Sequence, residues 1–151
     1  MTGHSGRYTP ETSCFYQGKT ITQIPGLLYN WYAVNNPNQL APQGWHIATD
    51  EDWKTLETFL GMSTSAVNDI NWRGTHQAEK LKTQSQKQYA QYPNWLEYDN
   101  NKVWSTNTTG FTAMPGGCRL FNGNWNDVNG GIGFWWTATA DPTSNKKAWY
   151  R

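Results

Sequence analysis

A segment dense in glycine, asparagine and large aromatic residues, 110–136, constrains the fold of this chain most strongly. Glycine and asparagine adopt turn conformations that most other residues avoid, and both weaken helices and strand interiors. The segment therefore predicts short strands separated by tight turns, and it argues against a helical bundle. The strand-like pieces in this half of the chain are 103–105, 111–114, 118–121, 134–139 and 148–151.

Aromatic side chains compensate for a low apolar fraction. Hydrophobic residues make up 36% of the 151 positions, and the chain holds 10 Trp, 8 Tyr and 5 Phe. Because aromatic residues bury large areas, such a composition can form the core of one domain. Trp135 and Trp136 are adjacent, so within a strand they would face opposite sides. We expect the core to include these two residues together with Trp31, Trp45, Trp53, Trp104 and Trp149.

The clearest helix begins after Thr49. Thr49 is a good N-cap residue, and the acidic run 50–52 follows it, where the helix dipole favours negative charge. Asp52 stands at the position that completes a capping box, so capping accounts for these carboxylates without a catalytic role. Gly61 is placed to end the helix, whose predicted apolar face consists of Trp53, Leu56, Phe59 and Leu60.

The segments before this helix give simpler predictions. Residues 1–24 are expected to form a polar leader that ends in a possible first strand, and 25–26 is a Pro-Gly break. The continuous aliphatic and aromatic run 27–34 predicts a buried strand. Residues 35–43 predict a turn-rich loop.

A second, shorter helix is predicted over 76–83. Thr75 is its expected cap, and Ala78 and Leu81 would lie on one face. The polar run 84–101 predicts a long surface excursion, and loops of that length are usually functional or mobile.

Charge and hydropathy exclude several classes of partner. The formal net charge is +1, and no basic patch marks a nucleic-acid surface. Lys80, Lys82 and Lys87 form the only local excess and predict a solvated helix face and loop. The chain has no apolar run of transmembrane length, and its start shows no signal peptide. We therefore expect neither nucleic-acid binding nor membrane insertion.

Five separated phrases carry a resemblance to a known family: residues 27–34, 41–61, 80–83, 109–119 and 133–151. In that order they resemble the Fibrobacter succinogenes major paralogous domain, which is abundant in bacterial secreted and surface proteins. The chain departs from the family's pattern at Ala41, where members commonly have Cys. It departs again at Cys118, where members commonly have an aromatic residue.

The resemblance implies a fold and a location. The family looks like a branch of the C-type-lectin-like fold, related to the formylglycine-generating enzyme and to the variable proteins of diversity-generating retroelements. It implies the α+β class, with two early helices and then a small twisted antiparallel sheet with long loops. The domain would span 25–151 and lie outside the cell or on its surface. Family members usually continue past 148–151, so a truncated C-terminal end is one expectation.

Calcium binding is one candidate function for 125–127. This Trp-Asn-Asp tripeptide is the one with which calcium-dependent lectins supply an Asn and an Asp oxygen to the ion. Calcium takes about six to eight oxygen ligands, so a tripeptide is insufficient. The partner tripeptide is absent upstream, because residues 100–124 contain no acidic side chain. We therefore expect no metal and no other cofactor.

Catalysis has little support in the sequence. An enzyme of the formylglycine-generating superfamily would need a reactive thiol pair, for which only Cys14 and Cys118 are available. These cysteines could equally form one disulfide in a secreted chain or remain two thiols in a cytosolic one. His4, His46 and His76 match no hydrolytic motif, and His46 is expected to be a partly buried structural residue. We predict no catalytic residue.

Display of a binding surface is the function that the residue types favour. Asn side chains both donate and accept hydrogen bonds, and aromatics supply contact area at low entropic cost, although turns need the same residues. We expect a non-catalytic binding or adhesion module for a carbohydrate or a protein, with retroelement diversification as a further hypothesis. The alternatives are a formylglycine-generating-type enzyme and a structural module of a larger surface protein. The predicted ligand-binding residues are Asn122, Asn124, Trp125, Asn126, Asp127, Asn129, Ser144 and Asn145.

Overall fold

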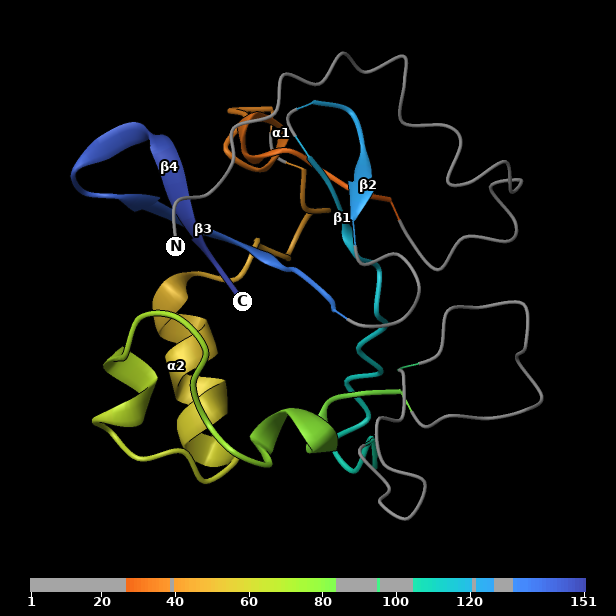
Figure 1. The fold of residues 1–151 in the computed structure, drawn as a ribbon. Coiled ribbons are helices and arrows are strands. Elements are labelled where there is room, and N and C mark those ends of the chain that lie inside the picture. The colour runs from red at the N-terminus through yellow and green to blue at the C-terminus, as the bar shows by residue number, and fades with distance from the viewer. Residues whose placement is uncertain (1–26, 39, 84–94, 96–104, 121, 127–131) are drawn as a thin grey trace. The chain divides into compact units, whose positions relative to one another are not determined.

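A computed structural model of the chain describes residues 27–38, 40–83, 95, 105–120, 122–126 and 132–151 (Figure 1). These residues belong to two compact units. Unit 1 contains Tyr29–Ala78 and Trp135–Arg151, and unit 2 contains 27–28 and the described part of Glu79–Phe134. Packing into two units does not establish separate folding, so the single domain over 25–151 stays a prediction. The predicted strand within 1–24 lies outside the described residues.

The architecture is α+β, as the family resemblance implies. Unit 1 contains two helices, α1 (Trp31–Val34) and α2 (Asp50–Phe59), and the antiparallel strands β3 (Trp136–Asp141) and β4 (Ser144–Tyr150). Unit 2 contains a smaller antiparallel pair, β1 (Cys118–Arg119) and β2 (Trp125–Asn126). The helices precede the strands along the chain (Figure 1).

Helix α2 begins as the sequence predicts. The Thr49 hydroxyl accepts a hydrogen bond from the backbone N–H of Asp52 at 3.1 Å, and the Asp52 carboxylate accepts the Thr49 N–H at 2.8 Å. The predicted capping box is therefore confirmed. At the other end Gly61 has φ +100°, a left-handed conformation that favours glycine and ends the helix.

The buried face of α2 is narrower than predicted. Trp53 and Leu60 are buried at 8% and 4% exposure, but Phe59 is 83% exposed. Successive residues turn by about 100° in an α-helix, so Phe59 lies about 120° around the axis from Trp53. The prediction that Phe59 belongs to the apolar face is wrong for that reason.

The predicted strand over 27–34 is also wrong, because its second half forms helix α1. The Asn30 side chain accepts a hydrogen bond from the backbone N–H of Ala33 at 2.9 Å and caps the helix. This cap competes with the strand preference of the aromatic residues. Only one face of the short helix is covered, so Trp31 is buried and Tyr32 is 56% exposed.

Two short 3₁₀ helices follow α2. Helix η3 (Ala66–Asn68) contributes the buried Val67. Helix η4 (Gln77–Lys80) occupies part of the predicted helix 76–83, but it is a single 3₁₀ segment in which Ala78 is exposed. Thr75 does not cap it with its side chain in the way we predicted; instead, its backbone N–H donates to the Gln77 side chain at 2.8 Å.

Strands β3 and β4 form the two-stranded antiparallel sheet of unit 1. Trp136 pairs with Tyr150 and Ala140 with Ala148, with irregular register between the pairs. On the other side of β3, the Ala138 N–H donates to the Ala48 carbonyl at 2.9 Å, so the segment leading into α2 runs beside the sheet. This places the start of α2 against β3.

The aromatic core forms from part of the predicted set. Trp135 lies 6.4 Å from Trp53 of α2 between ring centroids, whereas Trp136 contacts Tyr150 edge-on at 6.0 Å. The two adjacent tryptophans thus have different partners, although only Trp136 lies within β3. Trp45 does not belong to the core, because it is 76% exposed. The predicted core residue Trp104 lies outside the described residues.

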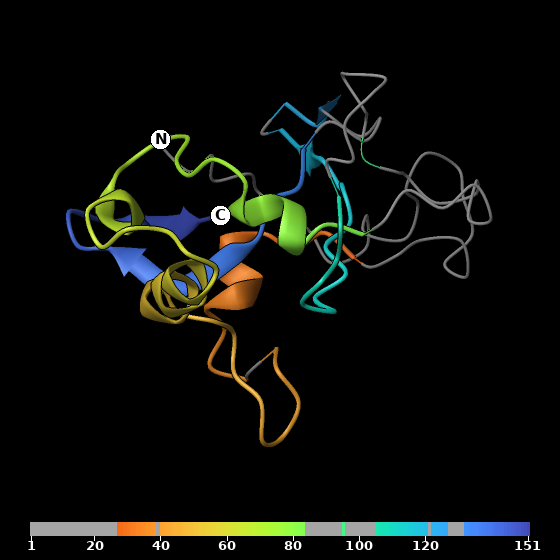
Figure 2. The ribbon, with the colours of Figure 1, turned by 90° about the horizontal axis from the view of Figure 1, so that it is seen from below.

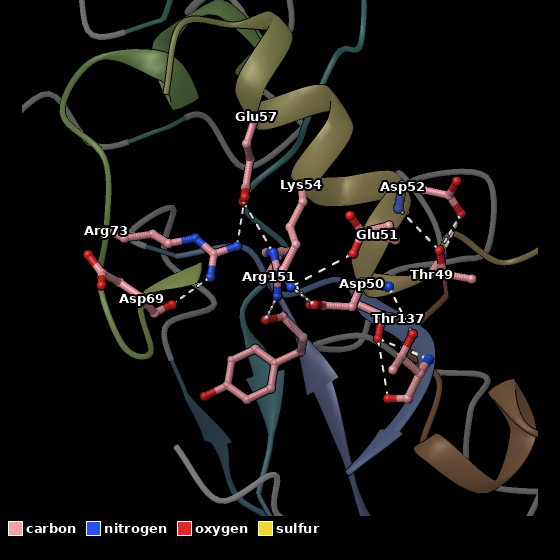
Figure 3. Close-up of polar contacts among 12 residues, drawn as sticks. Thr49, Asp50, Glu51, Asp52, Lys54, Glu57, Asp69, Arg73, Thr137 and Arg151 are labelled. Carbon is pink, nitrogen blue, oxygen red and sulfur yellow. Dashed lines mark hydrogen bonds and ion pairs between the residues drawn. The ribbon is translucent and has the colours of Figure 1, made fainter. Parts of the chain in front are cut away.

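A cluster of charged side chains joins α2, β4 and the loop after η3 (Figure 3). Arg151 contacts Asp50 and lies 3.2 Å from Glu57, measured from Nε to Oε1. The other Glu57 oxygen accepts from Arg73 at 2.6 Å, and Lys54 lies 3.1 Å from Asp50. The side chains of Arg151, Glu57 and Arg73 are only 10%, 12% and 12% exposed. We call these five residues the charged cluster.

The electrostatics of Asp50 follow from this arrangement. Burial disfavours its ionised form, but hydrogen bonds from Lys54 and Arg151 outweigh that effect and hold the pKa of Asp50 below its ordinary value. Its backbone N–H donates to the Thr139 hydroxyl of β3 at 2.9 Å. Asp50 is therefore anchored through both its side chain and its backbone.

Unit 2 is organised around Ala113. The Lys82–Ala113 bridge is parallel, and the Thr83 N–H and the Trp95 ring N–H both donate to the Ala113 carbonyl at 2.9 Å. Trp95 is buried, and the Lys82 ammonium lies 4.6 Å from its ring centroid. The predicted strand 111–114 is reduced to this isolated bridge at Ala113.

The charged cluster predicts a large difference between two equivalent substitutions on α2. Glu57→Gln removes the charge that two buried guanidinium groups face, and we expect unfolding to become easier by about 3 kcal/mol. Glu51→Gln is the matched control: Glu51 is 82% exposed and 3.8 Å from Lys54, so we expect a loss below about 1 kcal/mol. Urea unfolding of both variants measures this, and equal effects would contradict it.

The capping box predicts a pH dependence. The pKa of Asp52 is lowered to about 2, first because its carboxylate accepts the Thr49 N–H, and also because it accepts the Thr49 hydroxyl and contacts His46. The unfolded value is about 3.9, so this stabilisation is complete above that pH and is lost as pH falls through about 2. Asp52→Asn should lower Tm at pH 7, with the deficit shrinking towards pH 2. A deficit that is constant with pH would show that the charge contributes nothing.

Candidate functional site

The turn between β1 and β2 presents the first two predicted binding residues. Asn122 and Asn124 are both exposed there. The Leu120 N–H donates to the Asn124 carbonyl at 2.8 Å, and the Gly123 N–H donates to the Leu120 carbonyl at 2.9 Å. These bonds close the turn on itself. We call residues 120–124, of which 121 is not described, the β1–β2 turn.

Side chains give the β1–β2 turn further support. The Asn122 side-chain oxygen accepts the Asn124 N–H at 3.0 Å, which is an Asx turn. Gly123 has φ +85°, so a side chain at this position would be strained. The Arg119 Nε–H donates to the Gly123 carbonyl at 3.1 Å. Sequence reasoning missed this role of Arg119, because it depends on the hairpin register.

The β1–β2 turn can offer amide groups in a fixed arrangement. The Asn122 side-chain oxygen accepts the Asn124 N–H, and this bond holds the side chain in place. The Asn122 amide nitrogen can still donate to a ligand, and the Asn124 side chain adds a donor and an acceptor. Such groups suit hydrogen bonding to a ligand and supply neither a nucleophile nor a general base.

The other predicted residues of this half are only partly described. Trp125 and Asn126 form β2, in which Asn126 pairs with Cys118 and Trp125 with Arg119. Asp127 and Asn129 lie outside the described residues. Their predicted part in binding, and the tripeptide 125–127, are therefore untested by the structure.

Ser144 and Asn145 lie at a different turn, in unit 1. Ser144 begins β4 and pairs with Asp141 at the end of β3, and Asn145 follows it in the strand. The Asp141 carboxylate accepts the Thr143 hydroxyl at 2.6 Å and the Thr143 N–H at 2.7 Å, which lowers the pKa of Asp141. This turn belongs to unit 1 and the β1–β2 turn belongs to unit 2, so each is described within its own unit.

His46 differs from its prediction. Its side chain is 74% exposed, and its Nε2 lies 3.1 Å from the Asp52 carboxylate. The expectation of a partly buried histidine is wrong, because the chain around 45–46 lies outside the core. His46 instead contacts the capping box from the solvent side.

Lys82 also differs from its prediction. Its side chain is partly buried against Trp95, so it is not part of a fully solvated face. Desolvation lowers the pKa of Lys82, and the nearby Glu79 carboxylate opposes that effect. Lys80 is exposed as predicted, and Lys87 lies outside the described residues.

The cysteines and the residue types that bind metal ions lie only partly within the described part of the chain. Cys118 lies in β1 and is partly buried, whereas Cys14 lies outside the described residues, so one disulfide and two thiols both stay alternatives. Within the described ranges, no group of three or more His, Cys, Asp or Glu side chains could hold a metal ion. The described residues also contain no helix that is long and apolar enough to span a membrane.

Comparison with known proteins identifies a family. The family model described as the Fibrobacter succinogenes major domain matches residues 4–151. No curated protein and no solved structure matches this chain significantly. The match covers nearly the whole sequence and includes both turns. The chain therefore belongs to the Fibrobacter succinogenes major domain family.

Proposed function

We propose that this chain is a non-catalytic binding or adhesion module of a bacterial secreted or cell-surface protein. In this proposal the fold is C-type-lectin-like, and the ligand is a carbohydrate or a protein. The β1–β2 turn is the observation that carries the proposal. It holds two exposed amide side chains on a backbone that is closed by hydrogen bonds.

Preorganisation is the physical reason why this turn suits binding. A ligand that meets a fixed loop does not have to order it, so less free energy is lost on association. Asn side chains then make hydrogen bonds with either polarity. Diversification by a retroelement fits the same arrangement, because exposed side chains of a closed turn can change without altering its backbone bonds.

The charged side chains of unit 1 support the non-catalytic part of the proposal. Arg151 contacts both Asp50 and Glu57, and Asp52 serves the capping box. These groups stabilise the fold in their observed contacts. A general acid or base would need to face a substrate instead.

Two substitutions in the β1–β2 turn test the proposal. Asn122→Asp keeps the oxygen that accepts the Asn124 N–H but removes the amide donor, and Asn124→Ala removes an exposed amide. We expect both to weaken capture by about tenfold on a glycan array or on a peptide array, whichever binds the parent chain. Thr108→Ala, at an exposed turn of the same unit, is the control and should bind like the parent.

The outcomes separate the possibilities clearly. Equal capture of the parent and both Asn variants would remove the β1–β2 turn from the binding surface. Absence of parent capture on both arrays would contradict the binding function itself. Circular dichroism of each variant checks that the fold is retained.

A further inference from the structure

A second exposed segment, residues 35–46, lies between α1 and residues 47–49, which lead into α2. We call it the 35–46 loop. Every described residue in it is exposed except Ala41, which is partly buried, and residue 39 is not described. Figure 2 shows its later part extending away from α1, α2 and the β3–β4 sheet. The loop therefore contributes little to the core of unit 1.

Local hydrogen bonds shape this loop. The Asn35 N–H donates to the Trp31 carbonyl at 2.9 Å where α1 ends, and the Asn36 side chain accepts the Asn38 N–H at 2.9 Å. Near the end of the loop, the Trp45 N–H donates to the Pro42 carbonyl at 3.0 Å. Pro37 and Pro42 each fix one backbone dihedral, which reduces the freedom of the loop before any ligand binds.

The loop combines an exposed aromatic face with neutral amides. Trp45 is 76% exposed, and Leu40 is 38% exposed. The sequence from 35 to 45 contains no Asp, Glu, Lys or Arg, and its polar side chains include Asn35, Asn36, Asn38 and Gln43. Trp45 therefore offers its indole face to solvent beside uncharged amide side chains, and this combination is what the loop presents to a ligand.

This chemistry favours one class of ligand. Amides donate and accept, as the hydroxyl groups of a sugar require, and an indole face packs against the C–H groups of a sugar ring. The absence of charge gives no attraction for an anionic polymer. A protein partner would be expected to bury a wider apolar patch with charged or aromatic anchors at its centre. The loop has only Trp45 and Leu40 for that purpose.

We propose that the described residues of this loop, 35–38 and 40–46, form a binding site for neutral carbohydrate, with the Trp45 indole as the stacking platform. The residues that carry the site belong to unit 1, and none of them lies in the β1–β2 turn of unit 2. Asn36 and Asn38 shape the loop beside it, and the loop's amides supply hydrogen bonds to sugar hydroxyls. This site would stand even if the β1–β2 turn bound nothing.

Affinity electrophoresis of the full chain tests the proposal. The gels contain hydroxyethylcellulose, dextran or galactomannan as neutral polymers, and polygalacturonate as the charged comparison. We expect retardation in at least one neutral gel, and Trp45→Ala should raise the apparent Kd about tenfold. Trp72→Ala is the matched control, because Trp72 is 75% exposed in the same unit and should bind like the parent.

A second substitution tests the neutrality of the loop. Asn38→Asp keeps the size of the side chain and adds a charge at an exposed position. We expect it to weaken retardation by the same neutral polymer. Because Trp45 and Asn38 are exposed, both variants should keep the circular dichroism spectrum and Tm of the parent.

Three results would overturn the proposal. The parent could migrate unretarded in every neutral gel. It could be retarded by polygalacturonate alone. Trp45→Ala could be retarded as strongly as the parent. That result would count against the proposal even if Trp72→Ala lost retardation. Variants at Asn122 and Asn124 distinguish these failures from failure of the β1–β2 turn, because those positions lie outside the loop.

Discussion

The contact of Arg151 with Asp50 and Glu57 is the interaction on which unit 1 depends. Asp50 and Arg151 are separated by 101 positions in sequence, so their pairing fixes the end of β4 against the first turns of α2. A buried charge costs several kcal/mol unless it is paired, and each member of the charged cluster is therefore tied to the presence of the others. Arg73 extends the same constraint to the loop after η3 through Glu57. The packing of α2, of the end of β4 and of that loop therefore depends on the same set of ion pairs.

This use of charge has a consequence for the surface. The buried positions of the cluster require charged partners, whereas residues 35–45 carry no acidic or basic side chain and the β1–β2 turn exposes two asparagines. The scaffold of unit 1 can therefore be maintained while exposed neutral residues vary. This use of charge also explains why the carboxylates of α2, which are conspicuous in the sequence, serve capping and ion pairing.

Local signals in the sequence predicted the features that depend on a few neighbouring residues. The Thr49–Asp52 capping box and the turn at Asn122–Asn124 follow from side chains that bond to nearby backbone. The stop at Gly61 follows from the positive φ that glycine adopts at no cost. Helix α1 could have been found from its Asn30 cap, but the aromatic run after it favoured a strand. The α+β class was implied by the family resemblance, and the structure confirms it.

Features set by distant contacts could not be predicted in the same way. The pairing of Arg151 with α2 has no local signal, and neither has the contact of Lys82 with the Trp95 ring. Trp45 and Trp53 are the same residue type within one short stretch, yet only Trp53 meets Trp135 and is buried. Composition therefore overestimated the core. Composition also placed Trp45 of the 35–46 loop in the core, and only the structure shows that this side chain is exposed.

Backbone amide shifts of the isotope-labelled chain test the central claim, that charged side chains hold the scaffold while neutral exposed segments bind. The titrant is an oligosaccharide of the neutral polymer that retards the protein most. The account predicts concentration-dependent shifts in 40–46 and no progressive shifts around the charged cluster at Glu57, Arg73 and Arg151. Shifts centred on the charged cluster, with 40–46 unchanged, would contradict it.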